Sequence, residues 1–250
     1  MIEILQATAS PWQLGWCALV IVAAYTLRGA TGFGAGVVAI PLLVLALPLH
    51  VVIPVITTLG ILASFGQTIR EFRHVDWRGV RGLLLPTLVG AGAGLWLFQR
   101  LHPEMLRSAL ALFIIAYALW NLAPRKIELR APRVWLAPVA GASGGLVSTL
   151  FGGMAGPMFV VYLNALRLDK TRFRATISAI LFLLAVLRAG GYGSLGFYDA
   201  KALTLLVALV PVMVLGMVLG ERVHHGLDEH LFKRIVAALL VACGVALLLK

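Results

Sequence analysis

The fold is decided by the stretch Arg28-Gly29-Ala30-Thr31-Gly32-Phe33-Gly34-Ala35-Gly36-Val37-Val38-Ala39-Ile40-Pro41. Four glycines interrupt an otherwise apolar run, and one positive charge stands at its entrance. Lipid offers the backbone no hydrogen-bond partner, so irregular chain at membrane depth is tolerated only inside protein or beside a watery cavity. The stretch therefore predicts a broken helix next to a site.

A similar stretch occurs 120 residues later, in Ser148-Thr149-Leu150-Phe151-Gly152-Gly153-Met154-Ala155-Gly156-Pro157. The shift superposes small residues of the two stretches, namely Gly32 on Gly152, Ala35 on Ala155 and Gly36 on Gly156. Apolar segments that are interrupted by glycine or proline at matching places of two halves point to the binding site of a transporter.

The composition is that of a polytopic membrane protein. Hydrophobic residues make up 61% of the 250 residues and charged residues only 12%, whereas about a quarter of a soluble domain is charged. We expect an all-α fold in one transmembrane domain over residues 1–250, without a cleavable signal because the first residues lack a basic region. The net charge of +11 lies in short loops, where it orients spans, so it does not indicate nucleic-acid binding.

Ten apolar helical segments follow from the hydropathy pattern, at residues 14–31, 34–47, 51–69, 80–98, 106–123, 134–151, 153–165, 174–192, 201–219 and 232–249. Most approach the ~20 residues that cross ~30 Å of hydrocarbon. The segments 34–47 and 153–165 are shorter, and each follows a glycine-rich break. Each should form a helical hairpin with the segment before it, and whether the hairpins turn back within the membrane or cross fully stays open.

The basic residues predict the orientation. With the N-terminus outside, fifteen of the 21 lysine and arginine residues fall in inside loops, and positive charge favours the cytoplasmic side. Both termini should therefore lie outside. Residues 11–124 and 134–250 form the two expected repeats, and five segments in each make the second repeat inverted.

A shift of about 126 places Gly90 and Gly94 on Gly216 and Gly220. This small-xxx-small spacing brings helices close together; packing within the chain is favoured, and a homodimer is the alternative.

The two breaks predict a site for a small anion, because helices that begin at a break direct free N–H groups and a positive dipole end at the gap. The long segments that follow the breaks add hydroxyl groups at equivalent places, which are Thr57 and Thr58 in one half and Thr176 and Ser178 in the other. The candidate substrate-binding residues are Arg28, Thr31, Gly32, Gly34, Gly36, Thr57, Thr58, Ser148, Thr149, Gly152, Gly153, Gly156 and Ser178.

Two arginines lie within apolar segments. Arg28 either contacts the anion or reaches the cytoplasmic interface with its long side chain, and both alternatives stay open. Arg188 lies fourteen residues beyond Arg174, about 21 Å along a helix at 1.5 Å per residue. Arg188 is expected either in the outer third of the bilayer or at the outer interface, and the interface is favoured.

The apolar segments contain no Asp, Glu or His, so a side-chain proton relay, which membrane carriers build from such residues, is not expected. No spacing of histidines, cysteines or acids fits a catalytic set or a metal site. We therefore predict a protein that is not an enzyme and that uses neither metal nor cofactor.

The chain resembles the sulfite exporter TauE/SafE family over nearly its whole length. The resemblance rests on the glycine signatures of both stretches, on Gly144-Gly145 before the second, and on Val75-Asp76-Trp77 in a basic loop. It implies a bacterial inner-membrane carrier with two inverted repeats, whose partners are a small anion and the lipid bilayer. The expected function is export of sulfite or a sulfonate by alternating access. The alternatives are an importer of sulfonate or thiosulfate and an anion channel.

Overall fold

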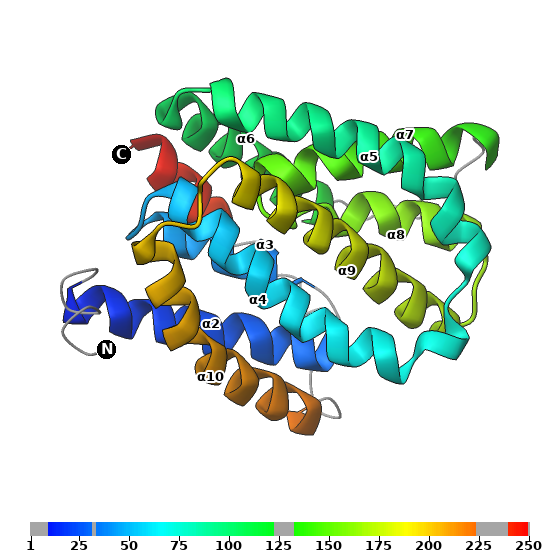
Figure 1. Ribbon diagram of the computed structural model, residues 1–250, viewed down its shortest axis with the longest axis horizontal. Helices are drawn as coiled ribbons and strands as arrows, with labels where there is room; N and C mark the ends of the chain where they lie inside the picture. The colour runs from blue at the N-terminus through cyan, green and yellow to red at the C-terminus, as the bar shows by residue number, and fades with distance from the viewer. Residues whose placement is uncertain (1–9, 32–33, 123–132, 224–239, 250) are drawn as a thin grey trace. The chain divides into compact units, whose positions relative to one another are not determined.

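The structure is a computed structural model that describes residues 10–31, 34–122, 133–223 and 240–249 (Figure 1). All regular structure in these residues is helical. The helices are α2 (Pro11–Thr31), α3 (Ala35–Val44), α4 (Leu49–Arg70), the 3-10 helix η1 (Phe72–His74), α5 (Trp77–Arg100), α6 (Pro103–Leu122), α7 (Arg133–Leu150), α8 (Gly156–Ala165), α9 (Lys170–Ser194), α10 (Ala200–Val223) and an apolar helix at Leu240–Leu249.

The predicted all-helical architecture is confirmed for the described residues. Each predicted segment between residues 14 and 219 corresponds to one helix, with ends that differ by up to four residues. The segment 232–249 is described only from Leu240. Within the described residues, four helices hold a window that is long and apolar enough to cross a membrane, namely Leu49–Gly66, Trp77–Arg100, Thr171–Ser194 and Ala200–Arg222.

The helices form two compact units. The first unit contains α2, α3, the start of α4 up to Val55, α6, α10 and the helix Leu240–Leu249. The second contains α4 from Ile56, η1, α5, α7, α8 and α9. The units therefore do not coincide with the predicted repeats, because each unit takes helices from both halves of the chain.

The first unit is built on the close packing of α2 against α10, which lie side by side in Figure 1. A Cβ atom added to Gly216 would lie 2.9 Å from the carbonyl oxygen of Val22, and one added to Gly220 would collide with the carbonyl oxygen of Thr26. Gly29 contributes from the α2 side, where a Cβ would approach Gly220 Cα to 3.1 Å. The absence of side chains at these positions allows the two backbones to touch.

The second unit is built in the same way on α5 and α7, which also lie side by side (Figure 1). A Cβ added to Gly90 would lie 2.9 Å from Ala142 Cα, and one added to Gly94 would lie 3.1 Å from the carbonyl oxygen of Leu146. On the α7 side, a Cβ at Gly145 would collide with the backbone of Thr87. The prediction that the glycine pairs serve packing within the chain is confirmed.

The short helix α8 is fixed inside the second unit by its own core. Phe159 is fully buried, and its ring occupies the space that a side chain at Gly144 would fill, 2.6 Å from the position of that Cβ. The Tyr162 hydroxyl donates to the carbonyl oxygen of Gly79 at 3.2 Å, which ties α8 to α5. These contacts hold the start of α8, and hence the second break, in one place.

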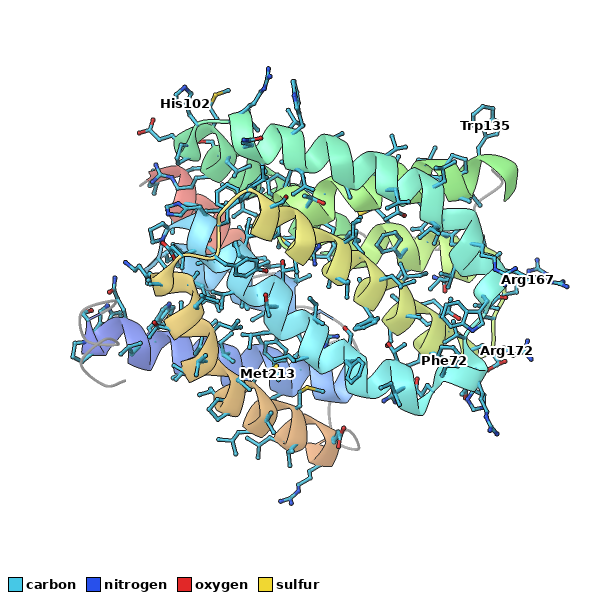
Figure 2. The ribbon with its side chains drawn as sticks, viewed as in Figure 1. Phe72, His102, Trp135, Arg167, Arg172 and Met213 are labelled. Atoms are coloured by element: carbon cyan, nitrogen blue, oxygen red, sulfur yellow. The ribbon has the colours of Figure 1, made fainter. Side chains whose placement is uncertain are left out.

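Polar contacts organise the far end of the second unit, where Figure 2 shows Phe72, Arg167 and Arg172 close together. The Thr176 hydroxyl accepts the backbone N–H of Asp76 at 2.9 Å. The Asp169 carboxylate caps α9 by accepting N–H groups of Thr171 and Arg172 at 3.0 Å. The predicted hydroxyl at Thr176 thus serves a structural contact at the basic end.

Candidate functional site

The second break lies between α7 and α8. Helix α7 ends at Leu150, and Gly152 (φ 65°) and Gly153 (φ 102°) both take left-handed backbone conformations. The N–H of Gly153 donates to the carbonyl oxygen of Ser148 at 3.0 Å, which is the bond that closes a Schellman C-cap. Only glycine adopts these angles without strain, so the sequence pair Gly152-Gly153 determines where α7 stops.

Arg188 of α9 lies against this break. Its Nη1 atom donates to the carbonyl oxygen of Ser148 at 2.5 Å, and its Nε atom donates to the carbonyl oxygen of Leu184 at 3.4 Å. A Cβ added to Gly153 would lie 3.7 Å from Nη2. The side chain is only 4% exposed. The side chain of Arg188 therefore turns inward to the last carbonyls of α7 and does not lie on the exposed surface of the second unit.

Two tyrosines extend the polar contacts around Arg188. Tyr192, one turn further along α9 and fully buried, donates its hydroxyl to the carbonyl oxygen of Thr149 and also interacts with the Arg188 guanidinium. The Tyr198 hydroxyl forms a 2.8 Å hydrogen bond with the Thr58 hydroxyl. Tyr198 also interacts electrostatically with Arg188. We call Thr58, Ser148, Thr149, Gly152, Gly153, Arg188, Tyr192 and Tyr198 the Arg188 cluster.

The charge of the cluster is unbalanced. Among the described residues the buried charged side chains are two arginines, Arg28 and Arg188, and no described Asp or Glu is buried. Within the described chain, no carboxylate lies within ion-pair distance of Arg188. The carbonyl end of α7 carries a partial negative charge of about half a unit, which compensates the guanidinium only in part. The Arg188 cluster is thus a buried site of net positive charge.

The Ser148 side chain adds an unused polar group to this region. Its hydroxyl oxygen is fully buried and has no hydrogen-bond partner in the described chain. A buried hydroxyl without a partner costs free energy, and such groups in a native protein require an explanation. A bound ligand or water would supply the missing partner.

The first break lies in the first unit, between α2 and α3. Helix α2 ends at Thr31, Gly32 lies outside the described residues, and Gly34 (φ 95°) precedes the first residue of α3. Gly36 lies in the first turn of α3. Arg28 is 7% exposed, so its side chain is buried within the protein.

The remaining predicted residues are not all brought to the Arg188 cluster. Gly156 is the first residue of α8, and Thr57 is a buried hydroxyl without a hydrogen-bond partner in the described residues. Ser178 is also buried without a partner, but it precedes Arg188 by ten residues, or about 15 Å along α9. Ser178 therefore does not reach the same ligand position as Arg188.

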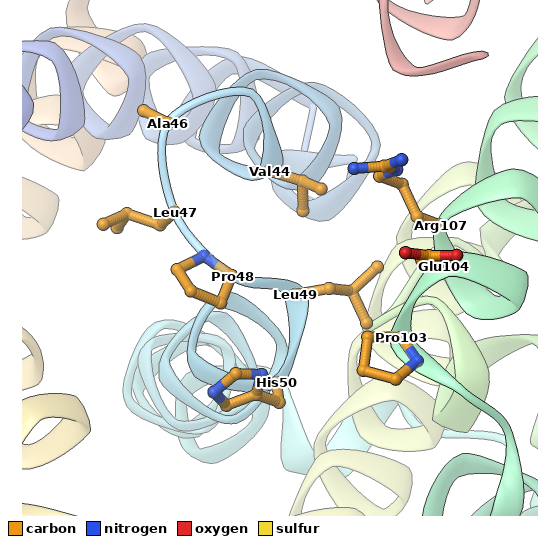
Figure 3. Close-up of a pocket in the computed structure, with 9 residues that line it drawn as sticks. All are labelled: Val44, Ala46, Leu47, Pro48, Leu49, His50, Pro103, Glu104 and Arg107. Carbon is orange, nitrogen blue, oxygen red and sulfur yellow. The ribbon is translucent and has the colours of Figure 1, made fainter. Parts of the chain in front are cut away.

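A pocket of about 330 Å³ opens in the first unit, where α3 ends and α4 and α6 begin (Figure 3). It is lined by residues 44 and 46–50 and by Pro103, Glu104 and Arg107. None of the predicted site residues lines it. The pocket wall contains both the Glu104 carboxylate and the Arg107 guanidinium (Figure 3), so the pocket is not a site of uniform positive charge.

The family profile described as sulfite exporter TauE/SafE matches residues 17–247. The chain belongs to the sulfite exporter TauE/SafE family. It is 27% identical over 178 residues to the probable inner membrane transporter protein TsaS of Comamonas testosteroni, covering 71% of this chain and 74% of that protein. It is 24% identical over 227 residues to the probable sulfite/organosulfonate exporter TauE of Cupriavidus necator, covering 88% and 87%. No solved structure matches the chain significantly.

Membership of the TauE/SafE family, together with the long apolar helices, makes the chain a multi-pass membrane transporter. The resemblance deduced from the glycine stretches is confirmed. The sequence reasoning nevertheless missed Arg188, Tyr192 and Tyr198 as members of the site. One signal was present, because an arginine with a tyrosine four residues later on an apolar helix places two polar groups on one face.

Proposed function

We propose that this TauE/SafE transporter is an alternating-access carrier that exports a small anion, with sulfite or a sulfur-containing organic anion such as a sulfonate as its substrate. The observation that carries the proposal is Arg188, a buried cation at a broken helix without a carboxylate within ion-pair distance in the described chain.

A buried charge is costly unless it is paired. The carbonyl of Ser148 satisfies one donor of Arg188, but a carbonyl dipole brings no full charge. An anion bound at the break would compensate the guanidinium, and the interaction would be strong because the site is shielded from water. A site of this kind selects against cations, so the geometry favours an anionic substrate over a metal ion or an amine.

The names of the relatives support the substrate class and the direction, since one is a probable sulfite/organosulfonate exporter. A membrane potential that is negative inside contributes about 2.3 kcal/mol per charge per 100 mV towards outward movement of an anion. Export therefore requires no side-chain proton relay. An importer of sulfonate or thiosulfate and an anion channel are the alternatives that the experiment below separates.

The helix contacts support an architecture of two inverted repeats. In the first unit, Gly216 and Gly220 approach the carbonyl oxygens of Val22 and Thr26, and in the second, Gly90 and Gly94 approach the backbones of Ala142 and Leu146. A shift of 126 relates the glycines of the two units, and a shift of 120 relates the residues that they approach. Each close pair thus joins the first helix of one repeat to the fourth helix of the other.

The odd number of segments in each repeat would invert the second copy, and the distribution of positive residues favours both termini outside, in the periplasm if the membrane is a bacterial inner membrane. The basic end of the second unit, with Arg167, Arg172 and Arg174, would then face the cytoplasm. Because the glycine pairs are already used within each unit, a homodimer would need another surface.

Transport by purified protein in lipid vesicles tests the proposal. If the protein is a carrier, vesicles that contain it and are preloaded with unlabelled sulfite should take up radiolabelled sulfite by counterflow. The uptake rate should saturate as the external sulfite concentration rises. A channel would instead conduct without counterflow. An imposed potential, negative on the side that corresponds to the cytoplasm, should accelerate efflux. The proposal fails if neither sulfite, nor methanesulfonate, nor thiosulfate is transported above the rate of protein-free vesicles.

A further inference from the structure

The guanidinium of Arg188 has donors that the protein does not use. Arginine carries five N–H donors in a rigid planar fork. The carbonyl oxygens of Ser148 and Leu184 take one each, and the Tyr192 hydroxyl accounts for one further contact. At most three of the five donors are therefore used, which leaves at least two N–H groups, and both Nη atoms lie within 4 Å of the position of a Cβ on Gly153.

The space next to these donors is open. Apart from the residues adjacent to Gly153 in the chain, a Cβ placed on Gly153 would have only two neighbours within 4 Å, the Nη2 atom at 3.7 Å and the Nη1 atom at 3.8 Å. An atom at that position would therefore touch the guanidinium at an ordinary contact distance, and it would meet no other residue beyond the two neighbours of Gly153 in the chain. Gly153 is partly accessible, whereas Arg188 is 4% exposed. A small group can thus reach the guanidinium from the Gly153 side.

We propose that Arg188 binds the transported anion through two oxygen atoms of one oxyanion group, in the space over Gly153. This inference rests on the proposed function and deepens it by defining the substrate class. Two donors of a planar fork match two oxygens on one centre, as in sulfite, a sulfonate or a carboxylate. Chloride offers one atom and thiocyanate is linear, so neither satisfies both donors.

The surroundings of Arg188 preorganise the fork. The Ser148 carbonyl fixes Nη1, and Tyr192 links the guanidinium to the Thr149 carbonyl. The N–H of Gly153 donates to the same Ser148 oxygen. The anion would thereby be positioned relative to the end of α7. Lysine retains the charge at position 188 but has no fork, so it cannot reproduce a two-oxygen contact.

Binding to the purified full-length protein tests the inference, with sulfite, methanesulfonate, chloride and thiocyanate as the probes. For the wild type, sulfite and methanesulfonate should bind at least about tenfold more tightly than chloride or thiocyanate, as expected for one additional charge-assisted hydrogen bond. This comparison uses no variant, so it holds even if a substitution impairs folding.

The variants Arg188→Lys and Arg188→Gln complete the test, with Arg172→Lys and Arg172→Gln as controls on the exposed start of the same helix. Arg188→Lys should weaken methanesulfonate binding about 10- to 100-fold and Arg188→Gln further, while the controls bind as the wild type does. Sulfonate binding that is unchanged in both Arg188 variants, or equal wild-type affinity for thiocyanate, overturns the inference and leaves the proposed function standing. A wild type that binds none of the four anions overturns the proposed function as well.

Discussion

The packing of α5 against α7 predicts opposite effects for two alanine substitutions only two residues apart. A Cβ at Gly90 would lie 2.9 Å from Ala142 Cα and would also collide with the Ala142 carbonyl. A Cβ at Gly92 has no atom within 4 Å. Both changes replace glycine by alanine in the same helix, so they share the gain in helix propensity and differ only in the contact.

The size of the effect follows from these distances. Ordinary contacts begin near 3.4 Å, so the backbone of α7 must move at least about 0.5 Å from its present 2.9 Å, and backbone atoms cannot rotate away. Overpacking of this kind costs about 1–3 kcal/mol, against a propensity gain of about 1 kcal/mol. We expect Gly92→Ala to raise the free energy of unfolding by up to about 1 kcal/mol. The free energy of unfolding of Gly90→Ala should be about 1–3 kcal/mol lower than that of Gly92→Ala.

The assay is thermal unfolding of both purified variants and the wild type in the same detergent. A difference of that size corresponds to a gap of roughly 2–12 °C between the two midpoints for a chain of this length. Gly220→Ala should behave like Gly90→Ala, because its added Cβ would meet the backbone of Thr26 and lie 2.9 Å from Gly29 Cα. Equal midpoints for Gly90→Ala and Gly92→Ala would refute the close approach of α5 and α7.

Three further predictions concern other contacts. Thr176→Val should lower the free energy of unfolding by about 1–3 kcal/mol, because the Asp76 N–H loses its acceptor; a midpoint equal to that of the wild type would contradict the contact. The backbone N–H of Arg172 holds the pKa of Asp169 below its ordinary value, so the cap stabilises α9 above that ordinary pKa and stops doing so as pH falls through the lowered folded-state pKa. Asp169→Ala should accordingly lower the thermal midpoint at pH 7 and lose that deficit in acid, and a deficit that persists below the folded-state pKa would argue against the cap. Gly152→Leu should abolish anion binding, since leucine is strained at φ 65°, while membrane insertion continues, and unchanged affinity would count against a site at the second break.

Much of the fold follows from patterns that act locally along the chain. The lengths of apolar runs locate the helices, and the glycine stretches locate both breaks. The short helix that is expected after each break is present, since α3 and α8 are each ten residues long. The glycine spacing also predicts that α5 and α10 each pack closely against another helix. It does not identify that helix, since the partners of Gly90 and Gly216 are backbone atoms of helices distant in sequence.

The candidate site was harder to predict, because its contacts also join residues that are distant in sequence. The position of Arg188 along α9 follows from its sequence number, but its principal partner is a backbone carbonyl forty residues away, and any residue type carries a carbonyl. Ser178 illustrates a second difficulty. The predicted 120-residue shift places Ser178 on Thr58, yet Thr58 contacts Tyr198, whereas Ser178 lies about 15 Å along the helix from Arg188.

The hairpin of α2 and α3 is closed at the end away from its glycine break. The Trp16 indole N–H donates to the Leu42 carbonyl at 3.0 Å, and the Gln13 amide donates to the Ala46 carbonyl at 3.0 Å. A ten-residue helix spans only about 15 Å, about half of the ~30 Å hydrocarbon core, and without these donors its last carbonyls would remain unsatisfied in hydrocarbon. During synthesis α3 is therefore expected to enter the membrane only together with α2, so the translocation machinery must accept the two helices as a single insertion unit.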